Sequence, residues 1–223
     1  MLTLVTSFYP GDRVKEQLRA YRSWLSLKLP IVAVQLERDI SFVSDTFPKV
    51  KIHATDKSGK EFGLIDSPRV ISLIDQAKDK DILIINSDII IAKVTPADFL
   101  KKWLPHPETM FKVGIRTEVP QGHKLPSGID VFRVTTMQYP IFKDIGYSLG
   151  SDTWDYWMVW TALTNGLSIK TVDIQLLHPS HKPGRSDTIK QRSREIFKQQ
   201  QNVDMHQLKK VVQALTDRAH LIK

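Results

Sequence analysis

The sequence has no cysteine among its 223 residues. Disulfide bonds, thiolate metal sites and cysteine nucleophiles are therefore excluded, and a reducing cytoplasm is the expected setting. Long apolar runs are absent as well, because no stretch approaches the roughly 20 residues that a membrane-spanning helix needs. The N-terminal residues carry neither a basic leader nor a small-residue cleavage site, so we expect a soluble protein without a targeting segment.

Basic residues outnumber acidic ones. The chain has 32 Lys and Arg against 24 Asp and Glu, a formal net charge of +8, and a pI near 9.6. Such a charge favours encounters with phosphate groups, which belong to nucleotides, nucleic acids or anionic membrane surfaces. The hydrophobic share of 41% and the charged share of 25% are those of a globular protein with a sizeable core.

Apolar runs and helical repeats alternate through the first half of the chain. The apolar runs predict buried strands at residues 2–7, 31–36, 51–54 and 81–91. The helices predicted between them cover residues 13–27, 40–47 and 68–78, the last with Pro68 in its first turn and Asp66 or Ser67 as its cap. This alternation predicts an α/β fold with a mainly parallel sheet flanked by helices, where ligands bind beyond the carboxyl ends of the strands. We therefore expect the functional site after Thr6 and near Asp88.

The second half of the chain is less regular. Its predicted strands cover residues 111–118, 129–134 and 168–172, with a loop over 119–128 and a helix over 151–165 that Gly166 ends. No break in composition divides the chain. We predict one domain over residues 1–185, with residues 186–223 as a basic helical extension of the same domain.

Polar residues interrupt the most apolar segment of the chain, residues 81–91, where Asn86 and Asp88 lie among isoleucines. A buried carboxylate is costly unless it meets a cation or several hydrogen-bond donors. A hard metal ion that bridges a diphosphate would supply that partner. The alternative is a turn formed by Asn86 and Ser87 between two short strands, in which Asp88 caps neighbouring backbone amides.

The tetrapeptide Ile-Asn-Ser-Asp at residues 85–88 follows this apolar run, and Thr-Ser-Phe at residues 6–8 ends the first strand. Together they resemble GT-A-type glycosyltransferases, whose hallmark is an Asp-x-Asp motif at a strand end. The resemblance covers about residues 2–182 and implies a single GT-A-like (Rossmann-like) domain. It also implies that Asp88 holds a manganese or magnesium ion on the diphosphate of a nucleotide-sugar donor, with Asn86 and Ser87 as nearby polar contacts. Asn86 stands where the family usually has aspartate, and the neutral amide leaves the metal requirement open.

The same resemblance implies further donor contacts. Thr6, Ser7 and Phe8 would hold the nucleotide base, the alternative being an ordinary strand-to-helix turn. Asp66 and Arg69 precede or begin the next helix, where an arginine can reach a base or a phosphate with two hydrogen bonds. A surface ion pair is the alternative for these two residues.

Acidic residues lie among large aromatic residues at residues 150–157. Aromatic faces stack on sugars, and a carboxylate beside an acceptor hydroxyl acts as a general base. Because this segment is similar to the acceptor-side helix of the family, Asp155 is the first candidate for the base and Asp152 the second. The alternative is a buried helix face of tryptophans that Asp152 caps.

Two histidines, His178 and His181, follow the last predicted strand. The resemblance implies that one of them completes the metal site, since imidazole is a ligand for manganese. Lys182 or Arg185 would neutralise the leaving diphosphate. The alternative is that these residues form part of the polar surface.

The favoured function is therefore a metal-assisted glycosyltransferase of the hexosyltransferase type. Its acceptor would be a glycan, a lipid-linked molecule or another hydroxyl compound, and the basic C-terminal segment would dock on an anionic membrane. A sugar-1-phosphate nucleotidyltransferase is the second hypothesis, but its glycine-rich phosphate loop after the first strand has only Gly11 as a counterpart. The third is a noncatalytic module that binds nucleic acid or another anionic partner.

Overall fold

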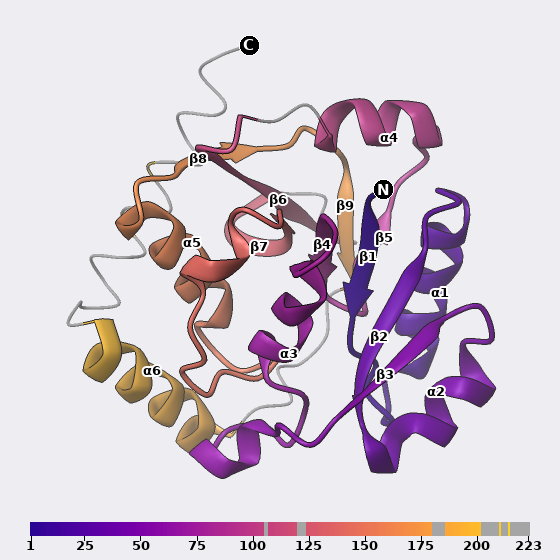
Figure 1. The fold of residues 1–223 in the computed structure, drawn as a ribbon. Helices are drawn as coiled ribbons and strands as arrows, with labels where there is room; N and C mark the ends of the chain where they lie inside the picture. The colour runs from indigo at the N-terminus through magenta and orange to yellow at the C-terminus, as the bar shows by residue number, and fades with distance from the viewer. Residues whose placement is uncertain (105–106, 120–123, 180–185, 202–209, 211–213, 215–223) are drawn as a thin grey trace.

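One sheet runs through the whole described part of the chain. The computed structural model describes residues 1–104, 107–119, 124–179, 186–201, 210 and 214. Within these residues nine strands pair in the order β3-β2-β1-β4-β7-β6-β9-β5, and β8 also pairs with β6. Helices lie on both faces of the sheet (Figure 1). The predicted fold class, an α/β domain with a mainly parallel sheet, is confirmed.

The first half of the sheet is parallel. Its strands are β1 (Thr3–Thr6), β2 (Ile31–Leu36), β3 (Lys51–Thr55) and β4 (Ile82–Ile85). Every residue of β1, β2 and β4 is buried, as expected for parallel strands covered on both faces. Helices α1 (Val14–Leu25) and α2 (Ile40–Thr46) connect the first three strands, close to their predicted positions.

The second half of the sheet is mixed. Strand β7 (Lys124–Val134) is antiparallel to both β4 and β6 (Met110–Val119). Strands β8 (Ser168–Thr171) and β9 (Leu176–Pro179) run parallel to β6, and β5 (Ile90–Ile91) is antiparallel to β9. The loop predicted over 119–128 is therefore too long, because β7 already begins at Lys124.

Two apolar cores cover the two faces of the sheet. Val5 and Ile84 point to one face, and their neighbours Leu4 and Leu83 to the other, because side chains alternate along a strand. The first core includes residues of α3 (Val70–Ile74), α5 (Trp154–Thr164) and α6 (Asp187–Gln201). The second includes residues of α1, α2 and α4 (Pro96–Trp103). No helix in the described residues is long and apolar enough to cross a bilayer.

The prediction of one continuous strand over residues 81–91 is wrong. The chain leaves the sheet after Ile85, turns through Asn86, Ser87 and Asp88, and returns as β5. The backbone N–H of Ile89 donates to the carbonyl oxygen of Asn86 at 3.1 Å, which closes the turn. The turn between two short strands that the sequence left open is therefore present. It places the polar side chains of residues 86–88 outside the buried strand β4.

The helix predicted over residues 68–78 also differs. Helix α3 begins at Val70 with Arg69 as its cap residue, and a short 3-10 turn follows over Asp75–Ala77. Pro68 lies outside the helix because residues 68 and 69 form bridges with Ser58 and Ser148. Such pairing requires extended backbone.

Strand β9 was not predicted, and the strand at 168–172 is not the last one. Residues Leu176–Pro179 contain a histidine and a proline, so their sequence lacks the run of β-branched residues that signals a strand. His178 therefore lies within the sheet. His181, Lys182 and Arg185 lie outside the described residues.

Candidate functional site

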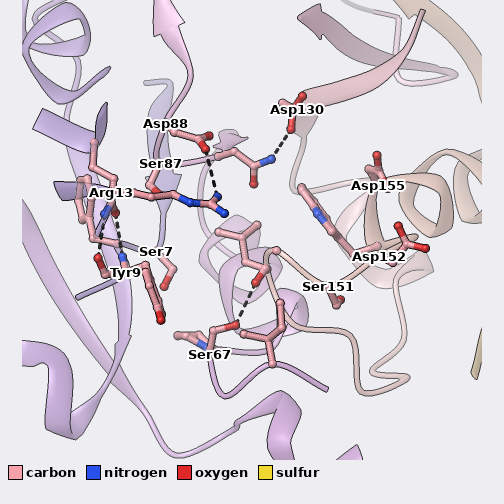
Figure 2. A pocket seen from close by; sticks show the side chains of 18 of the residues that line it. Ser7, Tyr9, Arg13, Ser67, Ser87, Asp88, Asp130, Ser151, Asp152 and Asp155 are labelled. Carbon is pink, nitrogen blue, oxygen red and sulfur yellow. Dashed lines mark hydrogen bonds and ion pairs between the residues drawn. The ribbon is translucent and has the colours of Figure 1, made fainter. Parts of the chain in front are cut away.

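A cavity of about 1230 Å³ opens at the carboxyl ends of β1 and β4 (Figure 2). Its walls come from the loop after β1, the turn after β4, residues 64–68, the ends of β6 and β9, and the first turn of α5. Most of the site residues proposed from the sequence line it: Ser7, Phe8, Asp66, Asn86, Ser87, Asp88, Asp152, Asp155 and His178. Loops at the carboxyl edge of a parallel sheet are the usual place for a ligand in such folds.

Two of the proposed donor residues lie elsewhere. Thr6 is buried, and its hydroxyl donates to the carbonyl oxygen of Ile85 at 2.7 Å, which ties β1 to β4. Arg69 forms an ion pair with Asp144 at 3.1 Å and lies over the ring of Phe62. Neither residue lines the cavity.

Two buried glutamines hold the loop that follows β1. Gln17 accepts from the backbone N–H of Tyr9 and donates to its carbonyl oxygen, each at 2.8 Å. With its amide oriented to satisfy its hydrogen bonds, Gln35 does the same for Phe8, at 2.6 and 3.1 Å. The N–H of Gly11 donates to the carbonyl oxygen of Tyr9. The backbone N–H groups of Phe8, Tyr9 and Gly11 therefore all have acceptors within the protein, and Pro10 has no N–H.

Two consecutive aromatic residues of this loop, Phe8 and Tyr9, have different surroundings. The ring of Phe8 is buried and stacks on Phe47, with ring centroids 3.8 Å apart. Tyr9 is 52% exposed and lines the cavity. An ideal Cβ on Gly11 would lie 2.1 Å from Cε1 of Tyr9, so the tyrosine ring rests directly against the glycine. The loop thus presents one aromatic face to a ligand.

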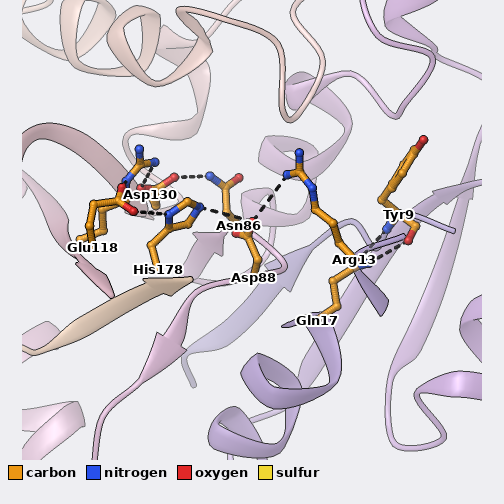
Figure 3. Close-up of polar contacts among 9 residues, drawn as sticks. Tyr9, Arg13, Gln17, Asn86, Asp88, Glu118, Asp130 and His178 are labelled. Atoms are coloured by element: carbon orange, nitrogen blue, oxygen red, sulfur yellow. Dashed lines mark hydrogen bonds and ion pairs between the residues drawn. The ribbon is translucent and has the colours of Figure 1, made fainter. Parts of the chain in front are cut away.

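Charged residues meet around Asp88. Nη1 of Arg13 lies 3.9 Å from Oδ2 of Asp88, and Nε2 of His178 lies 3.5 Å from the same oxygen (Figure 3). Arg13 is the residue immediately before α1, and His178 is part of β9. Three segments that are distant in the sequence therefore bring one anion and two basic groups to the same wall of the cavity.

A chain of ion pairs continues behind His178 (Figure 3). Nδ1 of His178 lies 2.9 Å from Oε2 of Glu118, and Nε of Arg116 lies 2.7 Å from Oε1 of the same carboxylate. Nη1 of Arg116 donates to Asp130 at 2.9 Å, and the other oxygen of Asp130 accepts from the side-chain amide of Asn86. These polar groups thus link β6, β7 and β9 to the turn after β4.

The charges of these ion pairs shift the pKa values of His178 and Glu118. Burial alone would lower the pKa of His178, but the carboxylates of Asp88 and Glu118 outweigh it and raise the pKa above its ordinary value. Burial alone would raise the pKa of Glu118, but His178 and Arg116 bring it below its ordinary value. The carboxylates therefore favour a protonated imidazole when no metal ion competes for the ring.

The expected metal site can be compared with this geometry. Within the described residues no three His, Asp or Glu side chains are arranged to hold a metal ion. Asp88 and His178 alone place an oxygen and a nitrogen 3.5 Å apart, which suits two ligands on one ion. Magnesium is commonly bound through one or two carboxylates, with phosphate oxygens and water completing the shell, and carboxylate ligands suit manganese as well. These two residues therefore fit a metal ion that binds together with a diphosphate.

The far side of the cavity carries Asp152 and Asp155 (Figure 2). Oδ2 of Asp152 accepts from Nε of Arg194 in α6 at 3.0 Å. Oδ1 of Asp155, in the first turn of α5, accepts from the N–H of Tyr156 at 3.0 Å. The alternative in which Asp152 caps α5 is not realised, because the cap residue is Thr153, with a φ of 73°.

Sequence reasoning missed several residues of the site. They are Tyr9, Arg13, Gln17, Gln35, Arg116, Glu118 and Asp130. Charged residues at alternate positions of an apolar strand were the available signal for Arg116 and Glu118. The pairing of Glu118 with His178 across the sheet had no signal in one sequence.

Comparisons with known proteins show likeness of fold only. Neither a protein-family model nor a curated protein sequence matches the chain. Matching structures include the inositol-1-phosphate CTP transferase from T. maritima (TM-score 0.47, 12% identity, 88% of this chain and 96% of that one). They also include a glycosyltransferase involved in glycosylation of the major capsid of PBCV-1 (TM-score 0.46, 13% identity, 91% and 99%). A third is a putative glucose-1-phosphate thymidylyltransferase from Bacillus anthracis (TM-score 0.44, 8% identity, 94% and 99%).

A CTP transferase, a putative thymidylyltransferase and a glycosyltransferase thus resemble this chain in fold. At these identities and TM-scores the likeness is distant. It does not distinguish between the two activities, so the choice depends on the site itself.

Proposed function

We propose that the protein is a glycosyltransferase that moves a sugar from a nucleotide-diphosphate donor to an acceptor hydroxyl. The observation that carries this choice is the loop after β1. Its N–H groups over residues 8–11 have acceptors within the protein or are missing, so they cannot cradle a triphosphate as a glycine-rich loop does. A sugar-1-phosphate nucleotidyltransferase needs such a cradle, and it is therefore the less favoured function.

The donor would lie between Tyr9 and Asp88. The exposed ring of Tyr9 offers a stacking face for the base. Arg13 stands beside Asp88 and would neutralise the diphosphate, to which Lys182 would add charge. Of the residues first proposed for the base, Ser7 and Phe8 line the cavity.

A divalent cation would bind between Asp88 and His178, with diphosphate oxygens completing its shell. Such an ion stabilises the negative charge that develops on the leaving diphosphate. The protein residues around it fix the position of the donor. His181 is a further candidate ligand.

The acceptor would bind near the first turn of α5. Asp155 is proposed as the general base that takes the proton of the acceptor hydroxyl if the reaction inverts configuration. Asp152, whose carboxylate pairs with Arg194, is the second choice. The acceptor is a glycan, a lipid-linked molecule or another hydroxyl compound, and basic residues of the C-terminal segment would hold the protein at an anionic membrane in the cytoplasm.

A thermal-shift screen tests this proposal. The purified protein would be heated with UDP-, GDP-, ADP- and CMP-sugars, each with and without manganese. A donor at a hundred times its dissociation constant adds about 2.7 kcal/mol of stability. We expect selective stabilisation by one donor that Asp88→Ala removes and that Asp45→Ala, a change at an exposed carboxylate of α2, retains.

Product analysis separates the two enzyme classes. Release of a nucleoside diphosphate from the selected nucleotide sugar supports the glycosyltransferase. Release of pyrophosphate from a nucleoside triphosphate and a sugar 1-phosphate would instead establish a nucleotidyltransferase. Stabilisation by nucleic acid alone, lost at high salt, would leave a noncatalytic binding module.

A further inference from the structure

The imidazole ring of His178 has a carboxylate beside each of its two nitrogens. Its side chain is buried in β9, where its backbone pairs with that of Glu118 in the parallel strand β6. This register places the two side chains together, and Nδ1 of the ring lies 2.9 Å from Oε2 of Glu118. A neutral imidazole has one N–H and one bare nitrogen. Because Glu118 lies closer to Nδ1, at 2.9 Å, than Asp88 lies to Nε2, at 3.5 Å, the form with hydrogen on Nδ1 and a bare Nε2 is favoured. Nε2 is the atom that faces Asp88.

Arg116 holds Glu118 in turn. Its guanidinium contacts Glu118 at 2.7 Å and Asp130 at 2.9 Å, and the Asp130 side chain is only 4% exposed. Buried carboxylates are costly without such a partner. Asp130 also accepts from the amide nitrogen of Asn86, and the amide oxygen of Asn86 points away from Asp130 (Figure 3). Each of the two carboxylates that pair with Arg116 therefore orients one polar side chain of the cavity wall.

We propose that Glu118 and Asp130, held by Arg116, are positioning residues for the cation site. Glu118 sets the ring nitrogen of His178 that faces the ion, and Asp130 sets the amide oxygen of Asn86. This inference rests on the proposed function, because it assumes that a cation binds at Asp88 and His178. It extends that function to three residues that do not contact the ion. Carboxylates behind ligating histidines commonly raise metal affinity in this way.

A purely structural role is the competing explanation, since the same ion pairs join β6, β7 and β9. Asp81 provides a matched control. It pairs with Arg133, which is also largely buried, but neither residue lines the cavity. Replacing Glu118 or Asp81 should lower stability. Only the replacement of Glu118 should also weaken cation binding.

The test measures binding of manganese ion in the presence of inorganic pyrophosphate, against a protein-free sample with the same pyrophosphate, by electron paramagnetic resonance. We expect Glu118→Ala to weaken binding on the order of 10- to 100-fold and Glu118→Gln to weaken it less, because one oxygen still accepts from Nδ1–H. Asp81→Ala should bind manganese like the wild type. Asp88→Ala and His178→Ala should lose binding. These ligand variants test the cation site independently of Glu118.

Two results would overturn the inference. If Glu118→Ala binds manganese like the wild type while His178→Ala does not, the cation site stands and the positioning role is wrong. If the wild type binds no manganese, the cation site and the positioning role fail together. Nitrogen-15 spectra of the wild-type histidines, recorded where the ring of His178 is neutral, give a check that needs no variant of Glu118. Hydrogen on Nε2 instead of Nδ1 would contradict the proposal.

Discussion

The side-chain amide of Gln17 binds the backbone N–H and the carbonyl oxygen of Tyr9, with both hydrogen bonds 2.8 Å long. Helix α1 thereby fixes the loop that presents the tyrosine ring to the cavity. Gln17 is almost fully buried, so its role cannot be taken over by water without opening the loop. The position of the ring therefore depends on this helix as well as on the contact of the ring with Gly11.

Gln17→Ala should therefore lower both stability and nucleotide affinity. Loss of the two partly buried hydrogen bonds leaves the N–H of Tyr9 without its acceptor, which costs about 0.5–1.5 kcal/mol for each bond, and frees Tyr9 to move. Urea denaturation and nucleotide titration would measure the two effects. Gln191→Ala, at an exposed position of α6, serves as the control. An unchanged nucleotide affinity in Gln17→Ala would place the base elsewhere.

Gly11→Ala should weaken nucleotide binding through Tyr9. A methyl group at this position would lie 2.1 Å from the tyrosine ring, so the ring must move. Loss of stacking in Tyr9→Ala should cost about 1–3 kcal/mol of binding free energy. In the Tyr9→Ala background, Gly11→Ala should have no further effect on affinity. An additive loss in the double variant would show that Gly11 acts independently of the ring.

Lys112 should make stability depend on pH above neutrality. Burial, with the nearby charges of Arg133 and Lys170, lowers the pKa of this lysine to about 8. Its ammonium donates to the carbonyl oxygens of Lys102 and Trp103 at the end of α4. The unfolded chain keeps the proton up to a pKa of about 10.4. Between these values the unfolded state binds more protons, so stability should rise with pH.

The measurement is the free energy of unfolding of the wild type and of Lys112→Met between pH 7.5 and 9.5. The rise attributable to Lys112 should be missing from the variant. A parallel pH dependence in both proteins would show that Lys112 keeps its proton in the folded state.

The first half of the fold could be predicted because its signals are local. The apolar runs at β1 and β2 are short, bounded and separated by a clear helical repeat. The strand expected over 81–91 failed because hydrophobicity cannot reveal a turn made by Asn86, Ser87 and Asp88 when isoleucines continue on both sides. Strand β9 could not be predicted because it forms by pairing with β6. The sequence of its own four residues does not signal a strand.

The candidate site, like the fold, could be predicted only in part. Asp88 and His178 stand out as polar residues beside apolar strands, and the cavity includes both. Arg69 and Thr6 looked equally plausible, but tertiary contacts with Asp144 and Ile85 engage them away from the cavity. Such contacts join residues far apart in the sequence, so a single sequence carries no pattern for them.

Gly128→Ala should disturb the ion pairs behind His178. An ideal Cβ at this position would lie 2.8 Å from Nε and 2.9 Å from Cγ of Arg116, so the arginine side chain must shift from the position in which it pairs with Glu118. We expect weaker manganese binding with a moderate loss of stability. Gly114→Ala is the control, because its Cβ would meet Leu176 and Val131 in the core and should destabilise the fold without touching Arg116. Equal metal affinities in the two variants would contradict the prediction.

Asp155→Asn and Asp152→Asn should differ in how they change turnover. If Asp155 is the general base, its amide variant should lower kcat about 10²- to 10⁴-fold and leave KM for the donor nearly unchanged. Asp152 is bound to Arg194 of α6, so its amide variant should act mainly on the loop before α5, and Arg194→Ala should reproduce its effect. Steady-state kinetics of nucleoside diphosphate release would measure both variants. A large fall in kcat for Asp152→Asn that Arg194→Ala does not share would exchange the two roles, because it could not come from the lost ion pair.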